Sequence, residues 1–541
     1  MTLSYAHGAS TVPLIGETIG ANLERTAARV PDAEALVSRP QGLRLTYAEL
    51  NGAVDRLARA LMAAGLESGD RLGIWSPNVA EWVLLQYATA KAGTVLVNIN
   101  PAYRTSELEY ALNQSGCRVL VAARAFKTSD YETMVDEVRP RLRTVERFVY
   151  LDSAGWDELL AGADRVSADD LRERGESLAF DDPINIQYTS GTTGAPKGAT
   201  LSHHNILNNG FFVGRYCRYS EEDRVCIPVP FYHCFGMVLG NLACTSHGAC
   251  MVIPAPAFEP VPVLEAVQEE RCTSLYGVPT MFIAELEHPD FASYELGSLR
   301  TGIMAGSPCP VEVMRRVIDR MHLREVTICY GMTETSPVST QTAPDDDVER
   351  RVSTVGRVHP HVEVKIVDPE TGRVTPRGEA GELCTRGYSV MLGYWDDPER
   401  TAEAIDPGRW MHTGDLATMD AEDYVNIVGR IKDMIIRGGE NVYPREIEEF
   451  LYTHPAIADA QVIGVPDERY GEEIMAWLRL REGESLTEAE LREWCAGKIA
   501  HFKVPRYVKV VDDFPMTVTG KVRKVEMRER SVELLGLSGS R

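Results

Sequence analysis

The chain has the length and composition of a globular protein with more than one domain. It contains 541 residues, of which 44% are hydrophobic and 25% charged, and this length exceeds what one small core accommodates. Its formal net charge of −23 argues against nucleic acid or an anionic membrane as the main partner, because both would repel the average surface.

The same overview predicts a cytoplasmic protein. No run of about eighteen apolar residues occurs, so no integral membrane segment is expected. No Lys or Arg precedes Arg25 and no sustained apolar block is present, which fits neither a secretory signal nor a transit peptide. The 11 cysteines include no C-x-x-C pair. The denser group from Cys217 to Cys250, with His233 and His247 nearby, fits no zinc-ligand spacing and is interpreted as small buried hydrophobes.

The first elements in chain order alternate between helical and strand patterns over residues 46–123, which predicts a parallel sheet covered by helices. Thr46 with Glu49 forms a capping box before an amphipathic segment, and so predicts a helix start. Ser106 with Glu109 is expected to open a later helix in the same way.

A loop follows the apolar run at residues 184–188, which predicts a strand. The loop reads YTSGTTGAPKGA, residues 188–199. Its glycines let backbone N–H groups point inward, its hydroxyls add donors, and Lys197 adds a positive charge, a combination that fits a polyphosphate. It is not a Walker A loop, because Pro196 stands at that motif's second glycine and Gly198 replaces its hydroxyl residue. A flexible linker is the alternative, but it suits neither the strand nor the lysine.

The rest of the chain continues the α/β pattern and then changes character. Short strands broken by Gly and Pro (VEVKIVD, GELCTRG, YVNIVGR) predict a β-rich subdomain over about residues 355–430. Helices expected at 444–452 and 487–499 predict a separate C-terminal α+β domain over residues 431–541. The expected fold class is α/β, with helix-covered parallel sheets in a large N-terminal domain over residues 1–430.

The motif YTSGTTGAPKGA resembles the phosphate-binding signature of the adenylate-forming superfamily, which contains acyl-CoA synthetases, aryl-CoA ligases, luciferases and peptide-synthetase adenylation domains. The resemblance extends from LTYAEL to TGKVRK, with several motifs in the family's order. It implies that the loop binds the phosphates of ATP through Thr189, Ser190, Gly191, Thr192, Thr193, Gly194 and Lys197.

The motif YGMTETSP resembles the family's second signature. This resemblance implies that Tyr330 lies against the adenine ring, with Gly331 also in the nucleotide site, and that Thr333 contacts the α-phosphate. It assigns Mg²⁺ to Glu334, since this hard cation prefers carboxylate and phosphate oxygens. Taken alone, the Thr-Glu pair would be interpreted as the start of a helix.

The motifs TGD and GR match the family's ribose site. Asp415 can accept two hydroxyl protons, and Arg430 can donate to the same sugar edge. An isolated GD is only a turn signal, so this assignment depends on its context. The loop GIMAGSPCP would supply Gly306, Ser307 and Pro308 near the adenine and the acyl chain.

The motif PMTVTGKVRK matches the family's catalytic-lysine motif and assigns that role to Lys521. The lysine would bridge the substrate carboxylate and the α-phosphate and neutralise the charge that gathers there. A solvated lysine in a turn is the more ordinary interpretation of this residue alone. The family also implies a mobile C-terminal domain that rotates about a hinge at Lys432. After rotation, the CoA tunnel would be lined by Arg437, Gly438, Gly439 and Glu440.

The segment FYHCFGM resembles the family's segment beside the acyl pocket. It implies that His233 gates the carboxylate site, while a core histidine is the competing interpretation. The acyl pocket is expected to have a small, unbranched lining that leaves room for an alkyl chain: Gly236, Met237, Gly240 and Gly306.

The resemblance implies an AMP-forming acyl-CoA synthetase that uses ATP, Mg²⁺ and coenzyme A, with catalytic roles on Lys521, Thr333, Glu334 and His233. VNINPAYRTSELEYAL and IMAGSPCP are most similar to medium-chain fatty acyl-CoA synthetases. An aryl- or cinnamate-type CoA ligase and a ligase that loads a carrier protein remain alternatives. A non-catalytic nucleotide-binding module would be expected to lose Lys521 or Glu334. The assembly state and the acetylation of Lys521 are left open, with a homodimer as one candidate.

Overall fold

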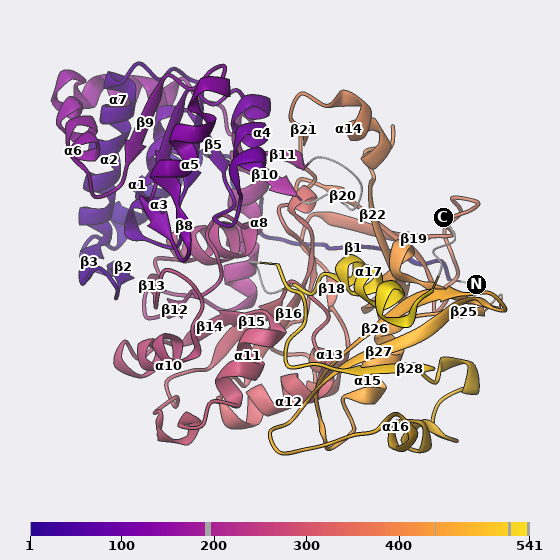
Figure 1. The fold of residues 1–541 in the computed structure, drawn as a ribbon. Coiled ribbons are helices and arrows are strands. Elements are labelled where there is room, and N and C mark those ends of the chain that lie inside the picture. Colours follow the sequence, from indigo (N-terminus) through magenta and orange to yellow (C-terminus); the bar gives the residue numbers. More distant parts are fainter. Residues whose placement is uncertain (1, 190–195, 439, 518–520, 538–541) are drawn as a thin grey trace.

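The computed structural model describes residues 2–189, 196–438, 440–517 and 521–537 (Figure 1). Within these ranges, no helix combines the length and the apolar character needed to cross a membrane. Helices outside the sheets described below are α1 (Ile19–Arg29), α5 (Tyr131–Val138), α6 (Ala154–Ala161), α7 (Ala168–Glu176), α8 (His203–Tyr216), α9 (Ala243–His247), α10 (Pro260–Glu269), α11 (Pro279–Leu286), α12 (Val311–Arg320), α13 (Val348–Ser353) and α14 (Pro398–Ala404).

A seven-stranded sheet has the order β21-β11-β10-β5-β4-β6-β9, and its strands β4, β5, β6 and β9 are drawn in purple in Figure 1. The strands from β10 to β9 are parallel, which confirms the prediction of a parallel sheet. α3 (Ala80–Ala92) and α4 (Thr105–Ser115) lie between its strands in the sequence, and α2 (Tyr47–Ala63) precedes its first strand, β4. The strands are β4 (Arg71–Trp75), β5 (Val95–Asn98), β6 (Val119–Ala122), β9 (Arg147–Tyr150), β10 (Pro183–Thr189), β11 (Lys197–Ser202) and β21 (Gly393–Tyr394).

One of the two expected helix starts is confirmed and the other is wrong. At α2 the Thr46 hydroxyl accepts from the Glu49 amide and the Glu49 carboxylate accepts from the Thr46 amide. At α4 the Arg104 amide donates to the Glu107 carboxylate at 3.0 Å, so this helix begins one residue before Ser106. Because Glu107 already satisfies the backbone at the start, the Ser106 side chain has no capping role to fill.

A nine-stranded sheet has the order β18-β17-β16-β15-β14-β12-β13-β2-β3. Its central strands are parallel, and two of its strands come from the N-terminal 46 residues. The strands are β2 (Glu34–Ser38), β3 (Leu43–Thr46), β12 (Arg224–Cys226), β13 (Cys250–Ile253), β14 (Ser274–Gly277), β15 (Thr301–Ala305), β16 (Glu325–Gly331), β17 (Val338–Gln341) and β18 (Arg357–Val358).

An antiparallel five-stranded sheet contains the three short strands expected from VEVKIVD, GELCTRG and YVNIVGR. Its order is β1-β19-β20-β22-β23. The outer strand β1 comes from the N-terminus and pairs with β19, a contact that the sequence pattern did not indicate. The strands are β1 (Tyr5–His7), β19 (Val362–Val367), β20 (Gly381–Gly387), β22 (Met411–Met419) and β23 (Val425–Arg430).

The C-terminal residues build a further sheet of strands β25, β24, β27, β26 and β28, drawn in yellow and orange beside the nine-stranded sheet in Figure 1. The helix expected at 487–499 is shorter, because the backbone leaves helical geometry at Ala496, where ψ is 125°. The elements are β24 (Ile435–Arg437), β25 (Glu440–Val442), α15 (Pro444–Leu451), β26 (Ile457–Asp467), β27 (Gly471–Leu480), α16 (Glu488–Cys495), β28 (Tyr507–Val510) and α17 (Lys524–Leu535).

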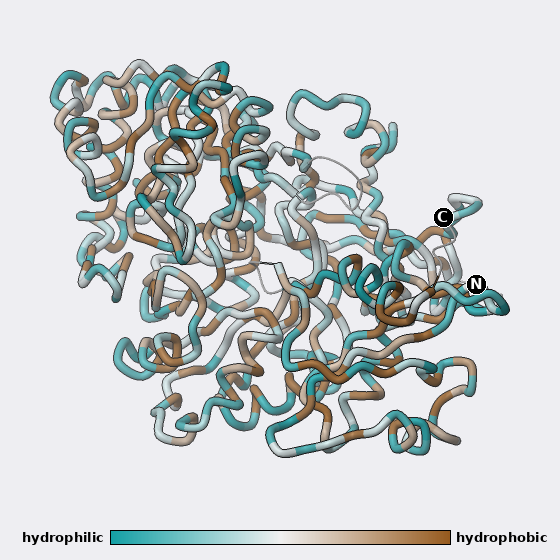
Figure 2. Tube along the Cα trace, viewed as in Figure 1, coloured by the Kyte–Doolittle hydropathy of each residue, from teal (hydrophilic) through white to brown (hydrophobic). Residues whose placement is uncertain are grey.

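The seven-, nine- and five-stranded sheets share hydrophobic clusters with one another, whereas the C-terminal sheet has clusters made only of C-terminal residues. Figure 2 shows hydrophobic stretches along the interior strands and hydrophilic ones on outer helices and loops. The C-terminal sheet has its own cluster, which includes the fully buried Ile435, Val462 and Leu478. A part of the chain with its own core can keep its structure when it moves relative to its neighbours.

Candidate active site

The candidate site lies where strands of several sheets end. Thr189 is the last residue of β10, Tyr330 and Gly331 end β16, and Gly306 directly follows β15. Carboxyl ends of parallel strands meet at one edge of a sheet, which is where ligands bind in open α/β folds. The expected phosphate-loop residues Ser190, Gly191, Thr192, Thr193 and Gly194 lie outside the described residues.

A buried carboxylate, Glu334, lies at the centre of the expected phosphate site. It belongs to the short 3-10 helix η5 (Thr333–Thr335) and is 5% exposed. Its Oε1 accepts hydrogen bonds from the Tyr394 hydroxyl at 2.9 Å and from Thr189 Oγ1 at 3.3 Å. The Lys197 ammonium lies 4.9 Å from the centre of the Tyr394 ring. A buried carboxylate surrounded by hydroxyls beside a lysine has the donor set that a hard cation and phosphates require.

Tyr394 was not foreseen from the sequence. It lies in β21, which pairs with β11, the strand that Lys197 begins. Burial, and then the nearby Glu334, raise the pKa of its phenol, so it stays a hydrogen-bond donor to that carboxylate. The letters GYWDDP carry no signal for this role, because only the β11–β21 pairing brings the tyrosine to Glu334.

Asp415 is held by two donors from different strands. Tyr330 donates its hydroxyl to Oδ2 at 2.8 Å, and Arg430 donates Nε to Oδ1 at 3.0 Å. Asp415 is 8% exposed; burial raises its pKa, and the charge of Arg430 opposes that shift. A carboxylate has about four acceptor positions, so this one can still accept from a sugar diol.

Lys521 reaches the same place from the C-terminal part of the chain. A Cβ added to Gly306, whose φ is +89°, would lie 3.8 Å from Lys521 Cε. Burial, and then the charge of Arg430, lower the pKa of Lys521, while Asp415 and Glu334 oppose this shift. The lysine side chain therefore lies beside the Gly306 loop and within the electrostatic influence of the charged groups of the candidate site. Ser307 and Pro308 follow Gly306 in the loop before α12.

His233 is a neutral imidazole in this environment. Burial, and then the charge of Lys521, lower its pKa to about 3. Its Nδ1 accepts the Phe235 backbone N–H at 3.1 Å. The next residue, Cys234, places its sulfur 3.8 Å from the hydroxyl of Thr333, so FYHCFGM packs against η5. The role of His233 as a gate stays a prediction.

Three of the residues expected to line the acyl pocket, Gly236, Met237 and Gly240, lie on the π-helix η3 (Phe235–Leu242), and the fourth, Gly306, follows β15. A Cβ at Gly236 would be 2.4 Å from the Pro230 carbonyl oxygen, so the missing side chain there serves close backbone packing. Met237 is 1% exposed, and its sulfur lies 3.2 Å from the amide nitrogens of both Asn98 and Gln187. Gly240 packs against Ile227. Their contact with an acyl chain stays a prediction.

The expected hinge and CoA-tunnel residues lie around β24. Lys432 is in the 3-10 helix η6 (Ile431–Asp433). Arg437 donates Nε and Nη2 to the carboxylate of Glu473 at 2.9 and 2.7 Å, within the C-terminal sheet. Gly438 donates its N–H to the Tyr470 carbonyl, and Glu440 opens β25. Gly439 lies outside the described residues.

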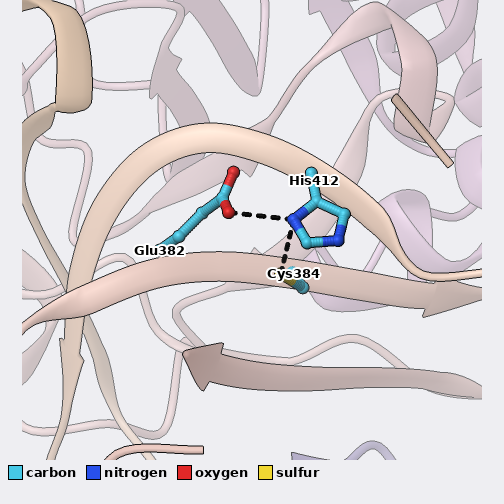
Figure 3. A group of neighbouring side chains, drawn as sticks. All are labelled: Glu382, Cys384 and His412. Carbon is cyan, nitrogen blue, oxygen red and sulfur yellow. Dashed lines mark hydrogen bonds and ion pairs between the residues drawn. The ribbon is translucent and has the colours of Figure 1, made fainter. Parts of the chain in front are cut away.

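A cluster on the five-stranded sheet was also missed. Glu382, Cys384 and His412 bring their oxygen, sulfur and nitrogen atoms within 4.8 Å of one another, the one such group of three metal-ligand side chains in the described ranges (Figure 3). His412 Nδ1 lies 2.9 Å from Glu382 Oε2 and 3.5 Å from Cys384 Sγ. These hydrogen bonds, that of Cys384 first, raise the pKa of His412 to about 10. The mutual hydrogen bonds account for the cluster without a bound ion.

The chain is similar to known proteins over most of its length. A family model described as AMP-binding enzyme matches residues 23–395, and one described as AMP-binding enzyme C-terminal domain matches residues 446–521. YngI of Bacillus subtilis (strain 168), named as a proposed acyl-CoA synthetase, is 50% identical over 97% of this chain and 99% of its own. The mitochondrial medium-chain acyl-CoA ligase ACSF2 of Danio rerio is 47% identical over 99% of this chain and 92% of its own.

Among solved structures, the anthranilate CoA ligase AuaEII in complex with anthranoyl-AMP superposes with a TM-score of 0.87 at 26% identity. The match covers 97% of this chain and 99% of that one.

Proposed function

The chain belongs to the AMP-binding enzyme family, and from that membership we propose that it is an AMP-forming acyl-CoA synthetase acting on medium-chain fatty acids. The observation that carries the proposal is that Lys521 lies beside the Gly306 loop, where it is influenced by Glu334 and by the bonded pair Asp415 and Arg430. These groups come from separate parts of the chain and together offer the charges that a carboxylate and a nucleoside triphosphate need.

In the first half-reaction an oxygen of the substrate carboxylate attacks the α-phosphorus of ATP, the bond to the bridging oxygen breaks, and pyrophosphate leaves. Lys521 lies between the substrate carboxylate and the α-phosphate, and it stabilises the negative charge that gathers on the oxygens bound to phosphorus. Asp415 and Arg430 bind the ribose, and Thr333 binds the α-phosphate. The lowered pKa of His233 makes it a neutral group beside the entering carboxylate.

The oxygen atoms at and around Glu334 fit a magnesium ion. Its carboxylate is buried and lies beside the hydroxyl groups of Thr189 and Tyr394, which is the oxygen-rich environment that this cation prefers. When bound, the ion would neutralise charge on the phosphate oxygens of ATP. Thr189 and Tyr394 hold Glu334 in place through its Oε1.

In the second half-reaction the thiolate of coenzyme A attacks the acyl carbon, and AMP leaves with the bonding electron pair. We infer that residues 431–541 rotate about Lys432 relative to residues 1–430, of which 355–430 form the β-rich part. The rotation would withdraw Lys521 and bring Arg437, Gly438, Gly439 and Glu440 to the thiol. The separate hydrophobic cluster of the C-terminal sheet supports a movement of this part as a unit.

The acid is assigned from the relatives. A relative at 47% identity is named a medium-chain acyl-CoA ligase, whereas the anthranilate CoA ligase is 26% identical. An aryl-CoA ligase is the second candidate, because that structure superposes over nearly the whole chain.

The experiment is a pyrophosphate-release assay over straight-chain acids from acetate to palmitate, with benzoates and cinnamates as the aryl arm. Each acid is tested with and without coenzyme A. We expect the highest kcat/KM with acids of intermediate length, and AMP release that requires coenzyme A. A preference for aryl acids would support the second candidate, and pyrophosphate release with none of the acids would contradict the proposal.

A reducing compartment, and within it the cytoplasm, is the proposed location. All 11 cysteines are free and buried, which suits a compartment that keeps thiols reduced. A homodimer stays a prediction.

A further inference from the structure

The strand that carries Asp415 is irregular at the point where it presents this residue. β20 and β22 pair Glu382 with Leu416 and Cys384 with His412, and a register shift lies between these pairs. Leu383 therefore faces the three residues of the TGD motif, residues 413–415, which form a bulge. Gly414 has φ +71°, a left-handed conformation that favours glycine. Such bulges re-aim side chains and interrupt the hydrogen-bond ladder.

The side chain of Glu382 supplies hydrogen bonds where the backbone ladder is interrupted. Its Oε1 accepts the Gly414 backbone N–H at 3.1 Å, inside the bulge. Its Oε2 accepts His412 Nδ1 at 2.9 Å, at the residue before the bulge, and Figure 3 shows this second bond. One carboxylate thus bonds two points of the same turn. Its side chain is 13% exposed, so solvent does little to weaken these bonds.

The partner of Glu382 is positively charged. Hydrogen bonds that the imidazole donates to Cys384 and Glu382 raise the pKa of His412 to about 10, so the protonated form is favoured at neutral pH. The Glu382–His412 contact is therefore charge-assisted, and bonds of this type are shorter and stronger than neutral ones. His412 Nε2 also faces Asp406 at 3.9 Å.

The bulge in turn holds Asp415. The Thr413 hydroxyl donates to the Leu383 carbonyl at 2.7 Å and accepts the Asp415 backbone N–H at 3.2 Å. The position of the Asp415 carboxylate thus depends on the conformation that Glu382 fixes.

We propose that Glu382, bonded to His412 and to the Gly414 amide, is a positioning residue that fixes the TGD bulge and so orients Asp415 toward the ribose hydroxyls of the nucleotide. It acts through Asp415 and does not itself contact the nucleotide. This inference rests on the proposed function, because Asp415 is assigned to ribose only there.

The test compares ATP with 2′,3′-dideoxy-ATP, which lacks the hydroxyls that Asp415 would bind. For wild type and the variants Glu382→Ala and Glu382→Gln, the ratio of kcat/KM for the two nucleotides is measured by pyrophosphate release. We expect Glu382→Ala to lower this ratio about tenfold, a typical coupling between groups in one network. The change should come mainly from a higher KM for ATP. Glu382→Gln keeps an oxygen acceptor for Gly414 and should give an intermediate ratio.

Glu363→Gln is the matched control. Glu363 is a glutamate of β19 in the same sheet, ion-paired with Arg386 and bonded to the Tyr5 hydroxyl, and it makes none of the bulge contacts. Its nucleotide ratio should equal that of wild type. If Glu382 had a purely structural role, Glu382→Ala would lower the melting temperature and leave the ratio of kcat/KM for the two nucleotides unchanged.

A folded Glu382→Ala protein with the wild-type ratio, or an equal loss in Glu363→Gln, would overturn the proposal. If Glu382→Ala does not fold, His412→Asn removes the charged partner and should lower the ratio in the same direction; an unchanged ratio there also overturns it. The two nucleotides are compared by equilibrium dialysis as well. If wild type releases no pyrophosphate with any acid, the proposed function fails, while the dialysis ratios still decide the role of Glu382.

Discussion

At the residue scale, the proposed formation of acyl-AMP depends most on the position of Lys521. It lies near Gly306 and in the electrostatic environment of Asp415, Glu334 and Arg430. Lys521→Ala should lower the rate of acyl-AMP formation at least about a hundredfold, because one positioned charge contributes several kcal/mol to such a barrier. Thioester formation from supplied acyl-AMP should stay largely intact. The two half-reactions are measured separately, and equal loss in both would contradict this division.

The lowered pKa of Lys521 also gives a pH dependence. Because burial and Arg430 favour the neutral amine, the lysine loses its proton below the ordinary lysine value of 10.5. The rate of acyl-AMP formation should therefore begin to fall at a lower pH than it would if Lys521 had an ordinary lysine pKa. The pH–rate profile of the first half-reaction in wild type checks this expectation.

Glu285 is a second residue in an unusual environment. It lies on α11, is fully buried, and neither carboxylate oxygen has a hydrogen-bond partner among the residues that the structure describes. Burial raises its pKa well above the ordinary 4.5, so the folded protein holds a proton that the unfolded chain releases. Its contribution to stability is complete below about pH 4.5 and is lost as the pH rises toward the folded pKa.

Glu285→Leu should consequently raise the melting temperature at pH 8 and flatten the dependence of stability on pH. Burying a polar group without a partner is costly, whereas a leucine of similar size packs well. Thermal unfolding from pH 5 to pH 8 measures the effect. Glu173→Leu on the exposed face of α7 is the control and should change little. A lower melting temperature for Glu285→Leu at pH 8 would show that the carboxyl has a favourable role.

At the element scale, the two helix starts allow a direct comparison. Thr46 caps α2 through its hydroxyl, and Thr46→Ala should cost about 1 kcal/mol of stability. Ser106 lies inside the first turn of α4 and is exposed, so Ser106→Ala should be close to neutral. Denaturant unfolding of both variants measures the difference, and an equal loss would mean that Ser106 supports α4 after all.

The same pair shows what local patterns can predict. Thr46 and Glu49 identify a helix start correctly because the capping contacts join residues three apart in the sequence. The identical spacing at Ser106 and Glu109 gives the wrong start, since Glu107 satisfies the Arg104 amide first. When a sequence offers two possible helix starts, the local pattern does not select between them, and the packing of the helix decides.

At the scale of the whole molecule, contacts between the N-terminal part, residues 1–430, and the C-terminal part, residues 431–541, help to keep Lys521 at the candidate site. Glu287, which follows α11, lies 3.5 Å from Arg479 and 3.7 Å from Arg481 of the C-terminal part. Glu449 of α15 accepts the Val311 backbone N–H at the start of α12. Under the proposed mechanism these contacts belong to the orientation that serves the first half-reaction, and the rotation would break them.

Glu287→Gln should thus slow acyl-AMP formation two- to fivefold and leave thioester formation unchanged or faster. The effect is modest because partly exposed ion pairs contribute only up to about 1 kcal/mol. Single-turnover rates of each half-reaction measure it. Glu349→Gln, which removes an ion pair of Arg315 within the N-terminal part, is the control and should change neither. Equal slowing of both steps by Glu287→Gln would contradict this role.

The sequence by itself determined the α/β class, the alternation that builds the parallel sheet, the family, and the residues expected at the nucleotide site. These features follow from short-range periodicity or from contiguous motifs. Only the tertiary structure decided that β1, β2 and β3 complete sheets made mostly of later residues, that Tyr394 bonds Glu334, and that Glu382 accepts the Gly414 amide in the bulge that contains Asp415. Each of these depends on a contact between segments far apart in the chain, and a periodic pattern reports that a side chain is buried but not which partner it meets.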